Sequence, residues 1–377
     1  MFSTLSYFHL QEYWWIIISL LGGILVFLMF VQGGQTMLYT LATDEEERAM
    51  LINALGRKWE YTFTTLVVFG GAIFAAFPLF YATSFGGAYW IWMIMLFCFI
   101  LQAVSYEFRS KPKNIFGPRV YEVFLLVNGF LGTFILGALL GTFFHGSLFS
   151  VNQMHLSQWE SHFHGLEAIL NLNSLLLGLA VVFLTRILSM LFFMNMINDE
   201  VIYVRAQKQL LYNTVFFFIF ILFFIRLFLV MDGFNYDPQT KIVSLETAKY
   251  FHNMVHLPLV GLMLVGGLVL IITGIMLSLT RHHFRDGIWY SGGGTILLIC
   301  SLMILAGLNH TCYYPSLYNL QHSLTIENSS SSQYTLKVLG YVSLFLPFVM
   351  AYIVIAWRSI TKDQMEPGDL DKEVTVY

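Results

Sequence analysis

Hydrophobic residues along the chain form nine long runs, each separated from the next by a polar segment or a short turn. A helix needs about 20 mostly apolar residues to cross the hydrocarbon core of a bilayer. By this measure the sequence predicts nine transmembrane helices, near residues 14–32, 61–83, 88–107, 120–143, 166–194, 210–231, 255–280, 289–310 and 336–357. We therefore expect an all-α integral membrane protein with one membrane domain over residues 1–377.

The second and third runs are separated only by the turn at residues 84–87. No charged residue lies between Glu60 and Glu107, and this stretch is too long for one crossing but fits two. The pattern predicts a helical hairpin. Pro78 lies near the far end of its first helix, where we expect a bend whose freed carbonyl is satisfied locally.

Lysine and arginine residues predict the orientation, because cytoplasmic connections of membrane proteins carry an excess of them. Fourteen lie in one set of connections: Arg48, Arg57, Lys58, Arg109, Lys111, Lys113, Arg119, Arg205, Lys208, Arg281, Arg285, Arg358, Lys362 and Lys372. Three lie in the other set: Lys241, Lys249 and Lys337. The imbalance predicts an N-terminus outside and a C-terminus in the cytoplasm.

Two arginines, Arg186 and Arg226, fall inside predicted spans. A charge within the membrane is a candidate functional residue. Both, however, lie within a few helical turns of a span end, from which a long guanidinium side chain reaches the interface. We interpret them as snorkelling residues.

The connection before the second span has the pattern of a helix start. Residues 43–46, Thr-Asp-Glu-Glu, match a capping box with Thr43 as the N-cap. We expect a helix from there to about Lys58. Four apolar residues on it form a stripe that can lie on the cytoplasmic membrane surface: Met50, Leu51, Ala54 and Leu55.

Composition supports a membrane protein: 57% of residues are hydrophobic and 11% are charged, against about 45–50% and 25% in soluble proteins. The net charge of −3 and the lack of a basic tract argue against a nucleic-acid partner. The three cysteines, Cys98, Cys300 and Cys312, have no metal-binding spacing. Residues 329–332 are all serine, and we interpret this polar segment as a short flexible loop.

Glu60 is the first candidate for chemistry, with Trp59 beside it at the mouth of the second span. It is either a solvated acid at a helix end or a proton entry group. In a narrow apolar crevice, desolvation would raise its pKa and let it exchange protons at physiological pH. At the same face, Glu107 and Arg109 close the third span, and we interpret them as a pair that fixes its depth.

None of the eleven histidines lies in the middle of a span, which weakens a haem-carrying interpretation. His252 and His256 have the i, i+4 spacing of a metal site, but no third or fourth ligand is evident. No nucleophile elbow, phosphate-binding glycine loop, zinc motif or dinucleotide fingerprint is present. We predict no catalytic residue and no metal ligand in this chain.

Residues 48–111 carry a set of motifs that resembles the signature region of subunit II of the cytochrome bd quinol oxidases. The matching positions are Asn53, Trp59-Glu60, Gly70–Pro78, Tyr81-Ala82 and Glu107-Phe108-Arg109-Ser110-Lys111. Residues 319–339 are similar to a second segment of that family, and length and span number agree along the chain.

The resemblance implies a heterodimer that oxidises membrane quinol and reduces dioxygen to water, with protons drawn from the cytoplasm. Haem b and haem d are then expected in the partner, subunit I, while this half is haem-free and can hold a structural quinone. The implied fold is two four-helix bundles plus one peripheral helix. The implied location is the bacterial cytoplasmic (inner) membrane, in contact with the lipid bilayer and with room for a small accessory subunit.

For the site, the resemblance implies that Glu60 takes part in a proton route with Trp59 as its orienting neighbour. Gln32 and Gln35 occupy positions where the family usually has aspartates. A glutamine orders water but holds no transferable charge, which puts a relay through them in doubt. Asn53, Glu107, Arg109 and Gln102 are expected to serve structure or partner contact. Thr65 and Gln102-Ala103 also depart from the family, which commonly has Trp and Arg-Pro there.

Two other interpretations remain. A secondary transporter or channel subunit also needs many spans, but it usually shows an internal repeat and polar groups at midplane, neither of which the sequence shows. A purely structural subunit would leave Glu60 idle. Replacing Glu60 with glutamine separates this second alternative from a proton role.

Overall fold

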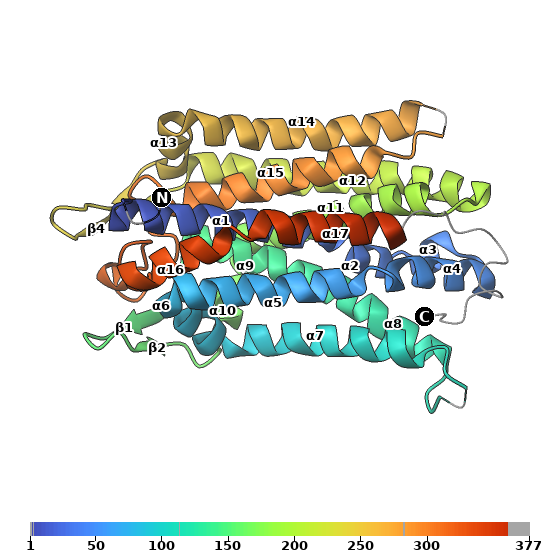
Figure 1. Cartoon of the computed structure of the whole chain (residues 1–377), viewed down its shortest axis with the longest axis horizontal. Helices are drawn as coiled ribbons and strands as arrows, with labels where there is room; N and C mark the ends of the chain where they lie inside the picture. Colours follow the sequence, from blue (N-terminus) through green and yellow to red (C-terminus); the bar gives the residue numbers. More distant parts are fainter. Residues whose placement is uncertain (1, 3, 113, 282, 361–377) are drawn as a thin grey trace.

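The computed structural model describes residues 2, 4–112, 114–281 and 283–360, and long helices lie side by side along most of its length (Figure 1). Within these described residues, eight helical segments are long and apolar enough to cross a membrane: Tyr7–Gln35, Glu45–Ala76, Tyr89–Phe108, Pro118–His145, Leu172–Met196, Glu200–Val230, Pro258–Thr280 and Gly287–Gly307. A bent pair, Gln333–Ser343 and Leu346–Ser359, makes a ninth if it is one span. Each of the nine predicted ranges overlaps one of these segments.

The first half of the chain contains α1 (Tyr7–Leu28), α2 (Phe30–Gln35), α3 (Leu38–Leu41), α4 (Glu45–Gly56), α5 (Trp59–Ala76), α6 (Pro78–Tyr81), the π-helix η1 (Ala82–Gly87), α7 (Tyr89–Phe108), α8 (Pro118–Val127), the π-helix η2 (Asn128–Gly132) and α9 (Thr133–His145). The second half contains α10 (Leu166–Ile169), α11 (Leu172–Met196), α12 (Glu200–Val230), α13 (Lys249–His256), α14 (Pro258–Thr280), α15 (Gly287–Gly307), the short 3-10 helix η3 (Leu320–His322), α16 (Gln333–Ser343) and α17 (Leu346–Ile360).

Two short antiparallel hairpins interrupt the helical pattern. Strand β1 (Phe149–Val151) pairs with β2 (Ser157–Trp159), with Phe149 opposite Trp159. Strand β3 (Gly233–Tyr236) pairs with β4 (Val243–Glu246), with Gly233 opposite Glu246. Both hairpins lie at the same end of the helix bundle, outside the long helices (Figure 1). The all-α expectation holds for the long helices, and the two hairpins lie in connections, which the hydropathy pattern does not describe.

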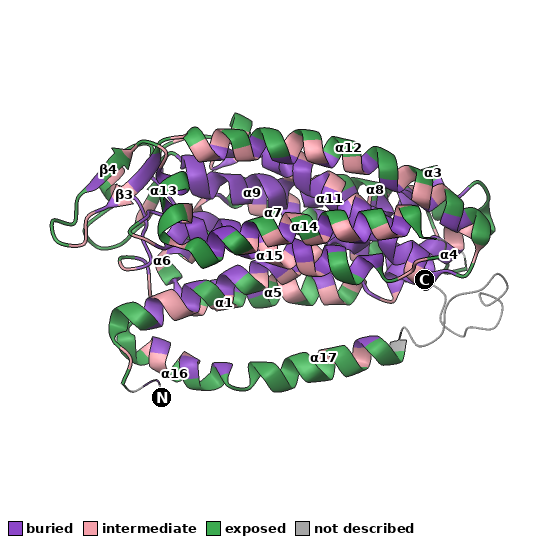
Figure 2. Ribbon diagram, turned by 90° about the horizontal axis from the view of Figure 1, so that it is seen from above, coloured by how far each residue is buried: buried purple, intermediate pink, exposed green. Residues whose placement is uncertain are grey.

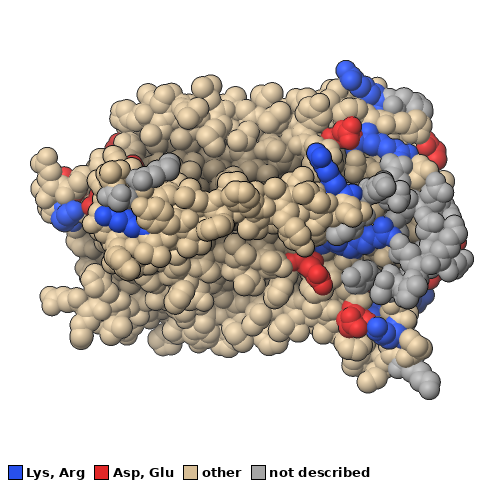
Figure 3. Space-filling model, in the orientation of Figure 1, with Lys and Arg blue, Asp and Glu red and all other residues tan. Residues whose placement is uncertain are grey.

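Charged residues gather at the opposite end of the bundle, around α3, α4 and the connection between α7 and α8 (Figure 3). Between the two ends the visible surface is almost free of charge (Figure 3). The connections predicted to be rich in Lys and Arg all lie at this charged end. Three of their lysines, Lys113, Lys362 and Lys372, lie outside the described residues. Helix α1 starts at the far end and α17 finishes at the charged end, as an odd number of crossings requires (Figure 1).

The first span is broken at Met29, where α1 ends and α2 begins. No proline causes this break. Instead the Thr62 hydroxyl donates to the Leu28 carbonyl oxygen at 2.9 Å, which satisfies an acceptor that the interrupted helix leaves open. Gly33 lets α2 lie directly against α11, because a Cβ there would collide with the Thr185 carbonyl.

The second span is interrupted at Phe77, directly before Pro78, as predicted. The expectation that the freed carbonyl is satisfied locally is wrong, because its partners come from far along the chain. The Ser331 amide donates to the Ala76 oxygen at 2.8 Å, and the Ser331 hydroxyl donates to the Ala75 oxygen at 2.6 Å. The prediction of a flexible loop at residues 329–332 is therefore wrong, because this segment closes the end of α5.

Helix α4 differs from its prediction in two respects. Its N-cap is Asp44, which accepts from the Glu47 amide at 2.8 Å, while the Glu47 carboxylate accepts from the Thr43 amide at 2.6 Å. The capping box is thus one residue later than expected, and the helix ends at Gly56. The apolar stripe, Met50, Leu51, Ala54 and Leu55, is buried against the protein and does not face lipid.

Helix α17 is the least covered of the long helices. It is bent by 41° from α16 and exposes most of its length (Figure 2). Its buried contact is Trp357, whose ring packs against Phe30, Tyr61 and Trp289, at 5.9, 5.5 and 6.1 Å between ring centroids. One aromatic side chain therefore holds the charged end of this helix.

Candidate functional site

Four charged side chains form an ionic cluster at the charged end: Glu45, Arg48, Arg109 and Glu122. Glu122 on α8 is fully buried, and its Oε1 accepts from Arg109 Nε at 3.1 Å and Nη2 at 2.8 Å. Glu45 accepts from Arg109 Nη2 at 2.6 Å and from Arg48 Nη1 at 2.7 Å. Two acids and two guanidinium groups thus balance where α4, α7 and α8 meet.

Tyr39 completes this cluster through its hydroxyl, which donates to Glu122 Oε2 at 2.7 Å. Burial, together with the hydrogen bond to the Glu122 carboxylate, raises the pKa of Tyr39 to about 12. The hydroxyl therefore remains a donor over the physiological pH range, and Glu122 keeps both oxygens satisfied. The cluster therefore joins two parts of the chain: the segment that follows α2, through Tyr39, and helix α8, through Glu122.

A second polar group lies next to the first and contains no charge. It consists of four fully buried amides, which we call the amide cluster: Gln32, Gln35, Gln102 and Asn128. Gln102 Oε1 accepts from Gln32 Nε2 at 2.7 Å, from Gln35 Nε2 at 2.8 Å and from Asn128 Nδ2 at 2.6 Å. Asn128 Nδ2 also donates to Gln35 Oε1 at 2.7 Å. Three of the predicted site residues therefore meet, from α2 and α7.

Trp59 reaches this group through Tyr106. The indole of Trp59 stacks on the Tyr106 ring at 5.8 Å between centroids, and the Tyr106 hydroxyl accepts from Gln35 Nε2 at 3.1 Å. Asn53 on α4 is buried near the same end of the molecule. The start of α5 is thus in contact with the aromatic wall of the amide cluster.

Glu60 does not join either cluster. Its side chain is exposed and lines an open groove of about 520 Å³ between α5 and α17. Arg57, Thr64, Thr65 and Tyr352 line the same groove. In this chain alone, the desolvated crevice expected around Glu60 is therefore not formed. Thr65, one of the departures from the family pattern, faces the same space.

Glu107 and Arg109 are not partners, contrary to the prediction. Glu107 is exposed and lies 3.3 Å from Lys111 Nζ, one helical turn on. Arg109 instead turns inward to Glu122 and Glu45. Glu122 is the functional residue that the sequence analysis missed, and its position as a single acid inside an apolar run is the signal that points to it.

Lys58, next to Trp59, is almost completely buried, and no hydrogen-bond acceptor reaches its Nζ in the described part of the chain. The ammonium lies 4.1 Å from the centroid of the Trp357 ring and 5.7 Å from that of Tyr61. Cation–π attraction to a tryptophan face is strong when both groups are desolvated. The contact ties the start of α5 to α17.

The two intramembrane arginines have different surroundings. Arg186 on α11 donates from Nε to the Thr36 hydroxyl at 2.8 Å, just beyond α2, so it links two elements. Arg226 is exposed near the end of α12 and lines a shallow apolar surface groove. Snorkelling describes Arg226, whereas Arg186 is a polar contact between helices.

The histidine pair of α13 does not converge on a common point. His252 Nδ1 lies 2.8 Å from Glu246 Oε1, whereas His256 Nδ1 lies 3.4 Å from Asn309 Nδ2. Over the described residues no three His, Cys, Asp or Glu side chains are arranged to hold a metal ion. The pair therefore serves two separate hydrogen bonds.

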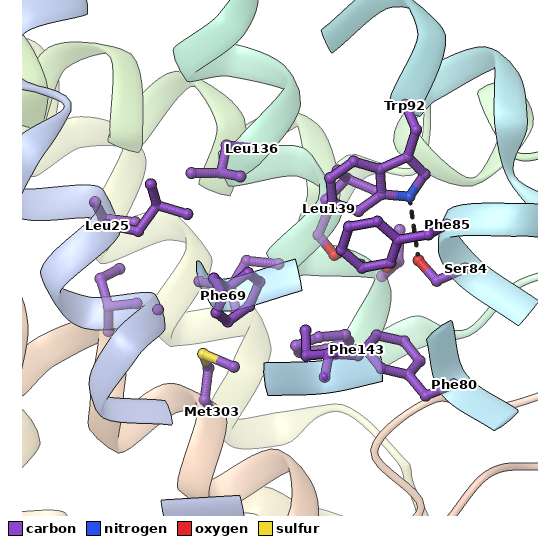
Figure 4. A pocket seen from close by; sticks show the side chains of 16 residues that line it. Leu25, Phe69, Phe80, Ser84, Phe85, Trp92, Leu136, Leu139, Phe143 and Met303 are labelled. Atoms are coloured by element: carbon purple, nitrogen blue, oxygen red, sulfur yellow. Dashed lines mark hydrogen bonds between the residues drawn. The ribbon is translucent and has the colours of Figure 1, made fainter. Parts of the chain in front are cut away.

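An apolar cavity of about 50 Å³ lies between α1, α5, α7, α9 and α15 (Figure 4). Phe69, Phe85, Trp92 and Phe143 point into it, and Trp92 Nε1 donates to the Ser84 hydroxyl at 3.4 Å. Pockets for small molecules usually enclose about 300–1,000 Å³. His145, the buried histidine of the described residues, is bonded to Ser174 instead. This cavity therefore does not fit a haem.

Comparison with known proteins gives a match to the family described as cytochrome bd terminal oxidase subunit II over residues 10–360. The chain is 24% identical to cytochrome bd-I ubiquinol oxidase subunit 2 of Escherichia coli, covering 96% of this chain and 98% of that one. It is 26% identical to cytochrome bd ubiquinol oxidase subunit 2 of Bacillus subtilis, covering 94% and 98%. It is also 26% identical to a probable cytochrome oxidase subunit 2 of Haemophilus influenzae, covering 93% and 92%.

Among solved structures, the bd oxidase from Geobacillus thermodenitrificans has a chain that matches this fold with a TM-score of 0.60. The match covers 94% of this chain and all of the other, at 17% sequence identity. At that identity the likeness concerns the fold. The fold is thus shared with a chain of that oxidase structure.

Proposed function

The chain belongs to the cytochrome bd terminal oxidase subunit II family, and from that premise we propose that it is the second subunit of a bacterial complex that oxidises membrane quinol and reduces dioxygen to water. The family match along nearly the whole chain is the observation that carries this proposal. The many apolar helices of the chain agree with a multi-pass membrane subunit, and we place the complex in the cytoplasmic membrane. Membership in this family does not favour a transporter or channel.

We place the haems of the complex on the partner, subunit I, as the family resemblance implies, and the small apolar cavity of this chain, about 50 Å³, is consistent with that placement. A structural quinone would find an aromatic lining and the Ser84 hydroxyl in that cavity, but the cavity would first have to widen. The chain's own contribution is structural support and proton supply.

Glu60 is the proposed proton inlet. It lies at the charged end of the molecule, beside Trp59, and no charged residue follows it before Glu107. Its groove is open in this chain, so a partner subunit packed over α5 and α17 would enclose it and remove water. Such enclosure is what a carboxyl group needs to titrate near neutral pH. Trp59, stacked on Tyr106, orients the start of α5.

Glu60→Gln tests this role in the assembled complex. We expect quinol oxidase turnover to fall by about a hundredfold or more, the lower range for loss of a proton-transferring group, with the reduced-minus-oxidised haem spectrum unchanged. Glu46→Gln is the matched control, because Glu46 is an exposed acid at the same end. Unchanged turnover of Glu60→Gln would instead assign this subunit a purely structural role.

A further inference from the structure

The amide cluster has an unusual hydrogen-bond balance. One oxygen, Gln102 Oε1, accepts from three different amides, although a carbonyl oxygen has two lone pairs. Three other polar atoms of the same cluster, Gln32 Oε1, Asn128 Oδ1 and Gln102 Nε2, have no partner within the described protein. All three side chains are fully buried. Two acceptors and one donor are therefore left open on side chains that hydrogen-bond to one another.

The backbone around the cluster is built to bring these groups together. Asn128 begins the π-helix η2, a rare wide turn that occurs frequently at functional sites. Gly129 lets η2 touch α2, because a Cβ there would collide with the Gln32 carbonyl oxygen. The Thr133 hydroxyl donates to the Gly129 oxygen at 2.7 Å and stabilises the wide turn. The break at Met29 similarly sets the position of α2.

A water molecule matches the open groups. Buried waters typically make about three hydrogen bonds to polar groups that would otherwise be unsatisfied. One water would donate to Gln32 Oε1 and Asn128 Oδ1 and accept from Gln102 Nε2. An ion is a poor match, because the four amides are fully buried and carry no charge to balance it.

We propose that the amide cluster is a binding site for ordered water, and that this water, in place of a titratable side chain, is what the cluster contributes to the proton route. The second part rests on the proposed function. The water would accept a proton on its oxygen and release another from an O–H, so no net charge is stored among the amides. Gln32, Gln35 and Gln102 then act as positioning residues.

X-ray hydroxyl-radical footprinting of the purified complex tests the water site, because radiolysis of a bound water modifies the side chains beside it. We expect modification of Tyr106, which is bonded to the cluster and only 1% exposed. Tyr250 is the internal control: it is equally buried, and its hydroxyl donates to the Phe144 oxygen. Tyr106 modified no more than Tyr250 would overturn the water site without requiring any variant.

Gln32→Leu removes one water acceptor and gives a second measurement. We expect Tyr106 modification to fall severalfold, whereas Gln11→Leu, which removes a buried glutamine elsewhere, should leave it unchanged. Equal Tyr106 modification in Gln32→Leu and wild type would contradict the site. If modification falls and turnover does not, the water exists but the relay is refuted. Glu60→Gln separately tests the proposed function, so the two failures are distinguishable.

Discussion

At the scale of single residues, the pair of Arg109 with Glu122 is the interaction most sensitive to change. Glu122 is fully buried and Arg109 nearly so, and removing Glu122 leaves the Arg109 guanidinium with the exposed Glu45 carboxylate as its remaining acidic partner. We expect Glu122→Gln to lower the free energy of unfolding by about 3 kcal/mol. Thermal unfolding of the purified complex, followed by loss of solubility or of intrinsic fluorescence, measures this.

Glu107→Gln is the matched control for that change. It removes an acid at the end of α7 that carries Arg109, but this acid is exposed and pairs with Lys111, one helical turn on. Exposed pairs contribute less than about 1 kcal/mol. An equal loss of stability in both variants would contradict the assignment of Arg109 to Glu122.

The residues of the amide cluster show what sequence alone reveals. Gln32, Gln35 and Gln102 stand out individually as departures from a family pattern, but Gln32 and Gln102 are 70 residues apart and nothing local predicts their contact. Asn128 gave no signal, since one amide in an apolar run is common. The role of Glu60 stays a prediction, because its surroundings depend on a partner that the sequence of this chain does not contain.

At the scale of elements, the Lys58 contact with Trp357 predicts how α17 is held. Trp357 is the buried anchor of a mostly exposed helix. We expect Trp357→Ala to increase hydrogen exchange along α17 severalfold, because an interface of aromatic and cation–π contacts is lost. Tyr352→Ala, on the same helix but 72% exposed, is the control. Unchanged exchange in Trp357→Ala would mean that other contacts hold α17.

The β3–β4 hairpin carries a pH-dependent contact. Partial burial opposes ionisation of Glu246, but hydrogen bonds from His252 and Lys249 outweigh it and hold the pKa of Glu246 below its ordinary value. A lowered folded-state pKa gives stability that is present above the ordinary value and is lost as pH falls through the folded one.

Hydrogen exchange of the segment from β4 to α13 should therefore increase as the pH falls from about 6 to about 3, after correction for the intrinsic pH dependence. In Glu246→Gln this segment should exchange faster at pH 6 and show little further change on acidification. A wild-type profile as flat as that of the variant would contradict the contribution of Glu246.

Element boundaries were predicted well where local chemistry sets them and poorly where distant contacts do. The break at Phe77 follows from Pro78, and the sequence showed it. The break at Met29 depends on Thr62, more than thirty residues away, and the local sequence gave no reason for it. The stripe of α4 was correctly predicted to be apolar, but whether protein or lipid covers it is a tertiary property.

At the scale of the whole molecule, nine apolar segments and a strong separation of charge emerge directly from the sequence, because hydropathy and the distribution of Lys and Arg are additive along the chain. The structure places the cation-rich connections at one end of the bundle (Figure 3). The arrangement of the helices as two four-helix bundles plus a peripheral helix stays a prediction. So does the direction in which the charged end faces, on which the proton inlet at Glu60 depends.

Single-cysteine labelling in oriented membrane vesicles tests that direction. The three native cysteines are buried and should not react with a membrane-impermeant maleimide. Glu46→Cys reports the charged end, and Met154→Cys, at a side chain that is 77% exposed beside β1, reports the other. The account predicts that Glu46→Cys is labelled only in inside-out vesicles and Met154→Cys only in right-side-out vesicles. The reverse pattern would place Glu60 on the outer face and contradict a cytoplasmic proton inlet.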